Sequence, residues 1–165
     1  MSSTALMSVE EYLRLTDKPY HEYRDGVISQ KAMGTKLHSI IQRTLERMLW
    51  SQGVEPWPEL TVRISPTKYL VPDIAVARAD FPGPYPTEPV LLCCEILSPG
   101  DRLGATLSKC EEYHAWGVPF CWIIDPVKRT AWEYGAEAEP IRVTDHLRAG
   151  EISISVPELF SALNR

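Results

Sequence analysis

The sequence lacks several features that would assign it to common protein classes. No stretch of the 165 residues approaches the uninterrupted apolar length of a membrane span, and the start, M-S-S-T-A-L-M-S-V-E-E, has neither the basic flank nor the apolar core of a secretory signal. We therefore expect a soluble, cytoplasmic protein with no membrane partner. Internal repeats and low-complexity tracts are also missing, and the length suits one domain over residues 1–165.

Several short chemical motifs are absent as well. The four cysteines form no C-x-x-C pair of the kind that builds a zinc site. Cys93 and Cys94 are neighbours in an apolar run, so on a strand they point to opposite faces, and we interpret them as small buried hydrophobic residues. The sequence has no glycine-rich phosphate loop and no G-x-S-x-G turn, so nothing in it supports a covalent nucleophile.

Positive charge is in short supply. The net charge is −5, which argues against a protein whose whole surface binds nucleic acid, because phosphate binding is driven by basic surface. A local basic cleft remains compatible with this charge. An enzyme that binds its substrate through metal ions also needs fewer lysines and arginines than a binding module does.

The sequence does contain an alternation of helical and extended patterns. Helices are expected from Ser8 to about Thr16, from Thr35 to Gly53, from Leu103 to Gly117 and over V-P-E-L-F-S-A-L near the end; strands are expected at 20–24 and 25–29 as a hairpin around Asp25-Gly26, and at 60–64, 70–77, 90–97, 118–126, 129–134, 141–143 and 151–156. The proline-rich stretch 80–89 reads as a loop and a candidate rim of a site.

The order strand, helix, strand across residues 90–126, with both strands apolar throughout, predicts a right-handed crossover in a buried sheet. The fold class that follows is α/β, with a mixed central sheet flanked by helices and an N-terminal hairpin.

Two carboxylates stand at the ends of strands that should be neighbours in this sheet, Asp73 and Glu95. Ligand sites gather at strand ends in open sheets, and two carboxylates there would bind Mg²⁺ or Mn²⁺, with the carbonyl of Ile96 and waters as further ligands. The metal would lower the pKa of an attacking water and neutralise charge on a scissile phosphate. Lys109, on the following helix, would orient that water or stabilise the developing charge. The pattern predicts a metal-dependent phosphodiesterase site.

The same residues have structural interpretations. Asp73 could be a turn or cap residue beside Pro72, and Glu95 could form a structural ion pair with Lys109. Lys109 could also extend from an ordinary surface helix towards solvent. Spacing does not decide between these interpretations and the catalytic one, because ion-pair networks also place carboxylates inside folds.

A series of short motifs runs through the chain in a fixed order. These are Glu22 with Asp25-Gly26, His38, Pro72-Asp73, Glu95 to Pro99, Lys109 with Tyr113, Gly117-Val118 and Trp122 to Pro126. In this order and spacing the sequence resembles the Uma-type restriction endonuclease family, a branch of the PD-(D/E)XK nuclease superfamily. The resemblance covers nearly the whole chain.

The resemblance implies a restriction-endonuclease-like fold and Mg²⁺- or Mn²⁺-dependent cleavage of DNA. Asp73 and Glu95 would be the motif acids that bind the metal. Lys109 would replace the lysine that the superfamily has two residues after the second acid, where this chain has Leu97. Glu22 and His38 would line the same cleft in supporting roles. A homodimer is expected, because cutting both strands of a duplex calls for two sites related by a two-fold axis.

One departure from the family pattern concerns the helix that carries Lys109. The family usually has an aspartate four residues before this lysine, where this chain has Ala105, and Asp101 one turn earlier is a partial substitute. With the acidic net charge, this departure makes a catalytically degenerate nucleic-acid-binding or interaction protein of the same fold the alternative. A nuclease that acts on RNA or on single strands is the third possibility.

Overall fold

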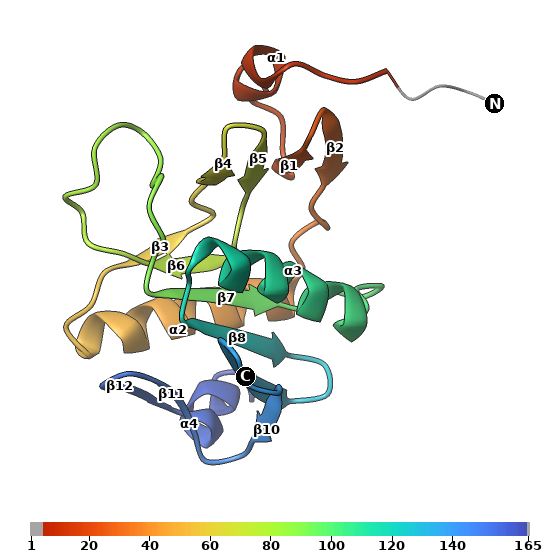
Figure 1. Cartoon of the computed structure of the whole chain (residues 1–165). Helices are drawn as coiled ribbons and strands as arrows, with labels where there is room; N and C mark the ends of the chain where they lie inside the picture. Colours follow the sequence, from red (N-terminus) through yellow and green to blue (C-terminus); the bar gives the residue numbers. More distant parts are fainter. Residues whose placement is uncertain (1–4, 165) are drawn as a thin grey trace.

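The computed structural model describes residues 5–164 and arranges them as an α/β fold with three sheets and four helices (Figure 1). The first sheet is antiparallel, with the order β2-β1-β5-β4. Its strands are β1 (His21–Arg24), β2 (Val27–Gln30), β4 (Val62–Ser65) and β5 (Lys68–Leu70). The predicted hairpin forms β1 and β2, and Asp25 and Gly26 form its turn, both at positive φ.

The central sheet is mixed and six-stranded, with the order β10-β9-β8-β7-β6-β3. Its strands are β3 (Pro56–Pro58), β6 (Ile74–Val76), β7 (Leu92–Ile96), β8 (Phe120–Asp125), β9 (Thr130–Gly135) and β10 (Ile141–Val143). β7 and β8 are parallel and are joined through a helix, as the sequence predicts, whereas the other neighbouring pairs are antiparallel. A separate hairpin consists of β11 (His146–Ala149) and β12 (Ile152–Ser155).

The helices begin where the sequence indicates, whereas the first helix ends at Leu13, before its expected end at about Thr16. They are α1 (Val9–Leu13), α2 (Lys36–Ser51), α3 (Leu103–Trp116) and α4 (Val156–Ser161). The hydroxyl of Ser8 caps α1, and that of Thr35 caps α2 by accepting from the N–H of His38 at 3.2 Å. Gly117 ends α3 with a φ of 124°, a value that favours glycine. No helix within residues 5–164 is long and apolar enough to cross a membrane.

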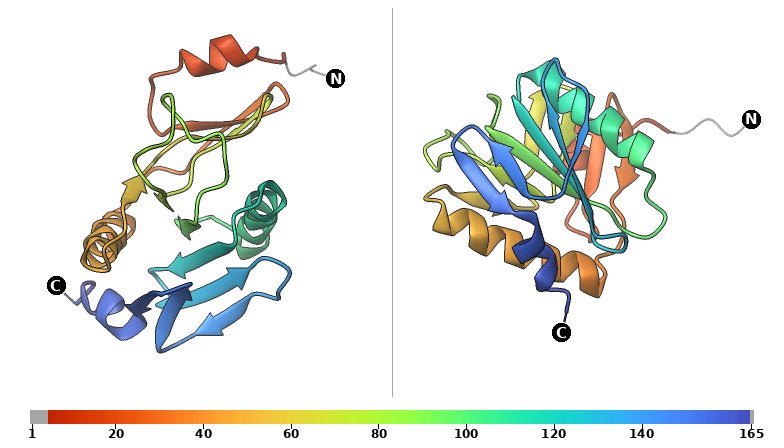
Figure 2. Two further views of the ribbon diagram at one scale, coloured as in Figure 1. Left: turned by 60° about the vertical axis from the view of Figure 1, so that its left-hand side comes forward. Right: turned by 90° about the horizontal axis from the view of Figure 1, so that it is seen from below.

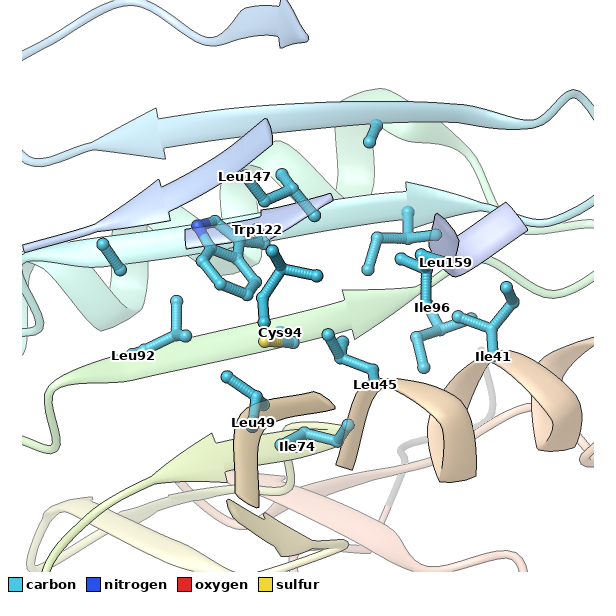
Figure 3. Packing of buried hydrophobic residues seen from close by; sticks show 14 of the residues in the cluster. Ile41, Leu45, Leu49, Ile74, Leu92, Cys94, Ile96, Trp122, Leu147 and Leu159 are labelled. Carbon is cyan, nitrogen blue, oxygen red and sulfur yellow. The ribbon is translucent and has the colours of Figure 1, made fainter. Parts of the chain in front are cut away.

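The two long helices cover opposite faces of the central sheet (Figure 2). On one face, Leu45 of α2 packs with Cys94 and Trp122 from β7 and β8, together with side chains from β11, β12 and α4 (Figure 3). On the other face, Cys93 packs with Tyr113 of α3. The prediction that Cys93 and Cys94 are buried on opposite faces is confirmed.

The expectation of one strand over residues 70–77 is wrong. β5 ends at Leu70 in the first sheet, and β6 begins at Ile74 in the central sheet. The break follows from Pro72, which has no N–H for a ladder, and from Val71, whose N–H donates to the Glu22 carboxylate at 2.7 Å. Residues 71–73 therefore link the two sheets, and Asp73 lies at the end of that link.

Two further strands are not predicted by the sequence. β3 reads P-W-P, and it is tolerated because it lies at the edge of the central sheet, where proline need not donate to a ladder. β11 contains His146 and Arg148, which are polar enough to read as a turn, and it forms through its pairing with β12.

Truncation of a side chain on the α2 face tests this account of the core. Leu45 is 0% exposed, so Leu45→Ala is expected to lower the free energy of unfolding by about 2–5 kcal/mol, measured by urea denaturation. The matched variant Leu13→Ala, at a leucine that is 39% exposed, is expected to cost less than about 1 kcal/mol. Equal costs at the two positions would contradict the assignment of the core.

Candidate active site

The central sheet brings Asp73 and Glu95 together at one edge. β6 and β7 are antiparallel with Ile74 opposite Cys94, so the residue before β6 and the residue after Cys94 are neighbours. The N–H of Ile96 donates to Asp73 Oδ2 at 2.7 Å, which ties the link directly to β7. Both carboxylates are buried, and both line a cavity of about 260 Å³.

Lys109 lies between two carboxylates on the α3 side of this site. Its Nζ is 2.8 Å from Glu95 Oε1 and 2.7 Å from Glu22 Oε2, and it approaches the carbonyl oxygen of Val71 at 3.4 Å. The hydroxyl of Tyr113, one turn further along α3, donates to the same Glu95 oxygen at 2.8 Å. Glu22 of the first sheet and Glu95 of the central sheet are thus joined through one ammonium group.

Asp73 is held by Lys31 and His38 on its other side. Lys31 Nζ lies 2.9 Å from Asp73 Oδ1, and His38 Nε2 lies 3.2 Å from the same oxygen. Burial by itself would raise the pKa of Asp73, but the charge of Lys31 and the hydrogen bond from His38 outweigh burial and lower the pKa below its ordinary value. Asp73 is therefore ionised at neutral pH, as a metal ligand must be.

Three residues of this site are missing from the sequence interpretation: Lys31, Gln42 and Glu59. Lys31 follows β2 and also pairs with Glu59 Oε2 at 2.6 Å. Gln42 Nε2 donates to Glu59 Oε1 at 3.2 Å and to the backbone carbonyl of Asp73 at 2.8 Å. Helical spacing could have found Gln42, which is one turn after His38 on α2. No comparable signal marks the other two, because they lie outside helices and strands.

The two members of the Glu95–Lys109 pair respond differently to burial. Burial raises the pKa of Glu95 to about 7, and the nearby charge of Lys109 only partly opposes this rise. Burial would lower the pKa of Lys109, but Glu95 and Glu22 together raise it above its ordinary value. Lys109 therefore stays protonated, and it can donate hydrogen bonds and stabilise negative charge but cannot accept a proton.

The cavity is lined by Ala105, which stands where the family pattern has an aspartate, and by Asp101 one turn earlier. Ile96 and Arg102 line it as well. Asp101 Oδ2 accepts from the N–H of Ser98 at 2.7 Å, so this carboxylate shapes the turn between β7 and α3 as well as facing the cavity.

A second ion-pair network fastens α3 to the first sheet. Arg24 of β1 donates to both oxygens of Glu112 on α3, at 2.8 to 3.1 Å, and Lys68 of β5 lies 3.1 Å from the same carboxylate. Glu112 is three residues after Lys109 and therefore on the same side of α3. These contacts fix the helix face that carries Lys109 against the sheet that carries Glu22.

The predicted residues thus meet in one place: the structure brings together Asp73, Glu95, Lys109, Glu22 and His38. The ion pair between Glu95 and Lys109, expected on the structural interpretation, is present. Lys109 does not extend towards solvent, because its side chain is only 13% exposed. Asp73 does not cap a turn, because its carboxylate binds the N–H of Ile96 and the ammonium of Lys31.

Similarity to known proteins identifies this α/β fold as nuclease-like. The crystal structure of a "putative nuclease belonging to DUF820" from Anabaena variabilis ATCC 29413 matches with a TM-score of 0.83 and 25% sequence identity, over 95% of this chain and 99% of that one. No curated protein matches the chain. The Uma2 family, described as "putative restriction endonuclease", matches residues 9–164, and the chain belongs to this family.

The Glu112 network predicts a measurable stability effect. Glu112→Gln removes the ion pairs with Arg24 and Lys68 and is expected to lower the free energy of unfolding by about 1–2 kcal/mol at pH 7. The neighbouring exposed position offers the matched control Glu111→Gln, which is expected to change stability by less than about 0.5 kcal/mol. A Glu112→Gln effect no larger than that of the control would show that the network does not hold α3.

The same variant has a defined pH dependence. Burial would raise the pKa of Glu112, but hydrogen bonds from Arg24 and Lys68 lower it below 4.5, its ordinary value. A carboxylate with a lowered pKa stabilises the fold above its ordinary pKa and loses that contribution as the pH falls through the folded value. The stability difference between wild type and Glu112→Gln should therefore shrink as the pH is lowered below 4.5, and a difference that grew in acid would contradict the assignment.

Proposed function

We propose that the protein is a divalent-metal-dependent nuclease that hydrolyses DNA phosphodiester bonds, with Asp73, Glu95 and Lys109 as its catalytic residues. The observation that supports this most directly is their convergence. Two buried carboxylates from neighbouring strands and a protonated lysine from the next helix border the same cavity. Membership of the Uma2 family supports a nucleic acid as the substrate.

The charges at the site suit a divalent cation. Four carboxylates, those of Glu22, Glu59, Asp73 and Glu95, share the ammonium groups of Lys31 and Lys109, and we call these six residues the carboxylate–lysine cluster. When all four carboxylates are ionised, their negative charge exceeds the positive charge of the two lysines and a protonated His38 together. Added positive charge at Asp73 and Glu95 would reduce the excess.

The donor set favours Mg²⁺ or Mn²⁺ in particular. No group of three or more histidine, cysteine, aspartate and glutamate side chains within residues 5–164 is arranged to hold a metal. Mg²⁺ keeps several waters and is commonly bound through one or two carboxylates, which Asp73 and Glu95 would supply. Ile96 lines the same cavity, and we propose its carbonyl as a further ligand.

The chain's own residues would then divide the chemistry. The bound metal would activate a water molecule and neutralise charge on the scissile phosphate. Lys109 stays protonated between Glu95 and Glu22, so it would donate to the phosphate oxygens as negative charge develops on them. His38 would hold the orientation of the Asp73 carboxylate through its 3.2 Å contact.

A second candidate is a catalytically degenerate protein of the same fold that binds nucleic acid or a protein partner. It is favoured by Ala105, which lines the cavity where the family pattern has an aspartate, and by the engagement of Lys109 with two carboxylates. This candidate predicts binding without cleavage.

Cleavage of duplex DNA in both strands would require two copies of this site. We therefore propose a homodimer as the cleaving species, with its two sites related by a two-fold axis. Analytical ultracentrifugation in the presence of duplex DNA distinguishes a dimer from a monomer that nicks single strands.

Cleavage assays test the proposed reaction. Purified protein is incubated with plasmid, with duplex and single-stranded DNA oligonucleotides and with RNA, in Mg²⁺, Mn²⁺ or EDTA. Wild type is expected to cleave DNA in either metal and not in EDTA. Asp73→Asn and Lys109→Met are expected to reduce the rate about 100-fold or more, because the first removes a metal ligand and the second removes a cation that stabilises negative charge on the reacting phosphate.

The surface positions Asp80 and Lys128 are both exposed and provide matched controls, Asp80→Asn and Lys128→Met, which should cleave at the wild-type rate. Thermal unfolding of each variant establishes that it is folded. Cleavage that persists in EDTA, or in both site variants, would exclude the proposed mechanism, and DNA binding without cleavage by wild type would favour the degenerate protein.

Metal binding can be measured without any substrate. A ligand that binds the folded state alone stabilises it by about 1.4 kcal/mol at a concentration ten times its dissociation constant. Mn²⁺ is therefore expected to raise the melting temperature of wild type and of Asp80→Asn. Asp73→Asn should show little or no increase, and an increase equal to that of wild type would place the metal elsewhere.

A further inference from the structure

The carboxylate–lysine cluster contains a second lysine with the same kind of environment as Lys109. Lys109 Nζ bridges Glu95 and Glu22, and Lys31 Nζ bridges Asp73 and Glu59. Each lysine side chain is 13% exposed. Each of the two proposed metal ligands therefore has its own ammonium partner, and the partner of Asp73 is assigned no role by the proposed reaction.

The position of Lys31 has an electrostatic consequence for Asp73. Its ammonium lies 2.9 Å from Asp73 Oδ1, which is within the distance of direct ion pairing. A divalent cation on the same carboxylate would be placed a few ångström from this ammonium, and like charges at such distances repel strongly in a buried site. The Lys31 ammonium and a divalent cation therefore compete for the Asp73 carboxylate.

Lys31 also lies where two cavities meet. The active-site cavity of about 260 Å³ and a neighbouring cavity of about 340 Å³ share four lining residues, Lys31, Ala32, His38 and Asp73. The second cavity continues past Lys18 and Tyr20. A polyanionic chain whose reacting phosphate lies at Asp73 and Glu95 would pass Lys31 on its way into the second cavity.

We propose that Lys31 is a second active-site lysine, whose ammonium neutralises Asp73 before a divalent cation binds and contacts the substrate phosphate backbone after the cation has displaced it. The contact with the phosphate backbone rests on the proposed function, whereas competition between Lys31 and a divalent cation at Asp73 requires no nuclease activity. Glu59 also binds this ammonium, at 2.6 Å, and so keeps it within the site.

Mn²⁺ titration without DNA, followed by isothermal titration calorimetry, tests the competition. Lys31→Met removes the competing charge and is expected to bind Mn²⁺ about tenfold more tightly than wild type, whereas Lys31→Arg keeps the charge and should bind with an affinity close to that of wild type. A lysine that served only to hold the fold would give weaker metal binding in Lys31→Met. Unchanged or weaker binding by a folded Lys31→Met would overturn the inference.

Glu59→Gln provides an independent variant should Lys31→Met fail to fold. It removes the second carboxylate that shares Lys31, so the ammonium acts on Asp73 alone and Mn²⁺ should bind more weakly. Lys31→Met and Glu59→Gln thus have effects of opposite sign, which loss of structure alone would not produce. Tighter or unchanged Mn²⁺ binding by Glu59→Gln would count against the competition.

Cleavage at saturating Mn²⁺ tests the contact with substrate. Lys31→Met is expected to have a kcat about tenfold below that of wild type despite its tighter metal binding, and Lys31→Arg should recover most of that loss. Wild-type kcat in Lys31→Met would overturn the phosphate contact. If wild type itself cleaves no nucleic acid, the proposed function fails, and the Mn²⁺ titration still decides the competition at Asp73.

Discussion

The packing of three buried carboxylates, those of Glu22, Asp73 and Glu95, and the half-buried carboxylate of Glu59 around two ammonium groups is the constraint on which the rest of this structure depends. The members of the carboxylate–lysine cluster come from the first sheet, the central sheet, α3 and the loops between them, and they meet where the two sheets join. Carboxylates in such a place are unfavourable unless each is matched by a cation or by N–H donors. Backbone N–H groups of Val71 and Ile96 supply part of that compensation.

The ion pairs of the cluster connect parts of the chain that do not share a sheet. Lys109 joins Glu22 of the first sheet to Glu95 of the central sheet, and the Arg24–Glu112 contact ties the first sheet to α3 one turn further along the helix. Removing one partner of a buried pair commonly costs about 3–5 kcal/mol, because the other charge remains buried without compensation. Loss of any one partner is therefore expected to destabilise the junction, and the same contacts fix the positions of the groups proposed to act on substrate.

The sequence predicts the parts of this arrangement that depend on local pattern. The caps at Ser8 and Thr35, the hairpin turn at Asp25-Gly26 and the helix end at Gly117 are all present, because each depends on a few consecutive residues. The parallel crossover between β7 and β8 is present because strands that are apolar throughout need covering on both faces.

The break between β5 and β6 and the positions of Lys31 and Glu59 in the site cannot be predicted from local sequence, because they depend on contacts between distant segments. The break between β5 and β6 depends on Glu22, which is 49 residues from Val71 and accepts its N–H. Lys31 and Glu59 have no periodic neighbours that would mark them, and their roles arise only when the loops after β2 and β3 come together at Asp73. The sequence does indicate Asp73 and Glu95, because Asp73 directly precedes β6, Glu95 lies near the end of β7, and these two strands are paired.

We propose that Asp73 and Glu95 hold one divalent cation between them, and anomalous diffraction from a crystal grown with Mn²⁺ measures this directly. An anomalous peak is expected within bonding distance of both carboxylates, in the cavity that Lys109 borders. A fully occupied peak elsewhere, or no peak at a Mn²⁺ concentration that saturates binding in solution, would contradict this proposal.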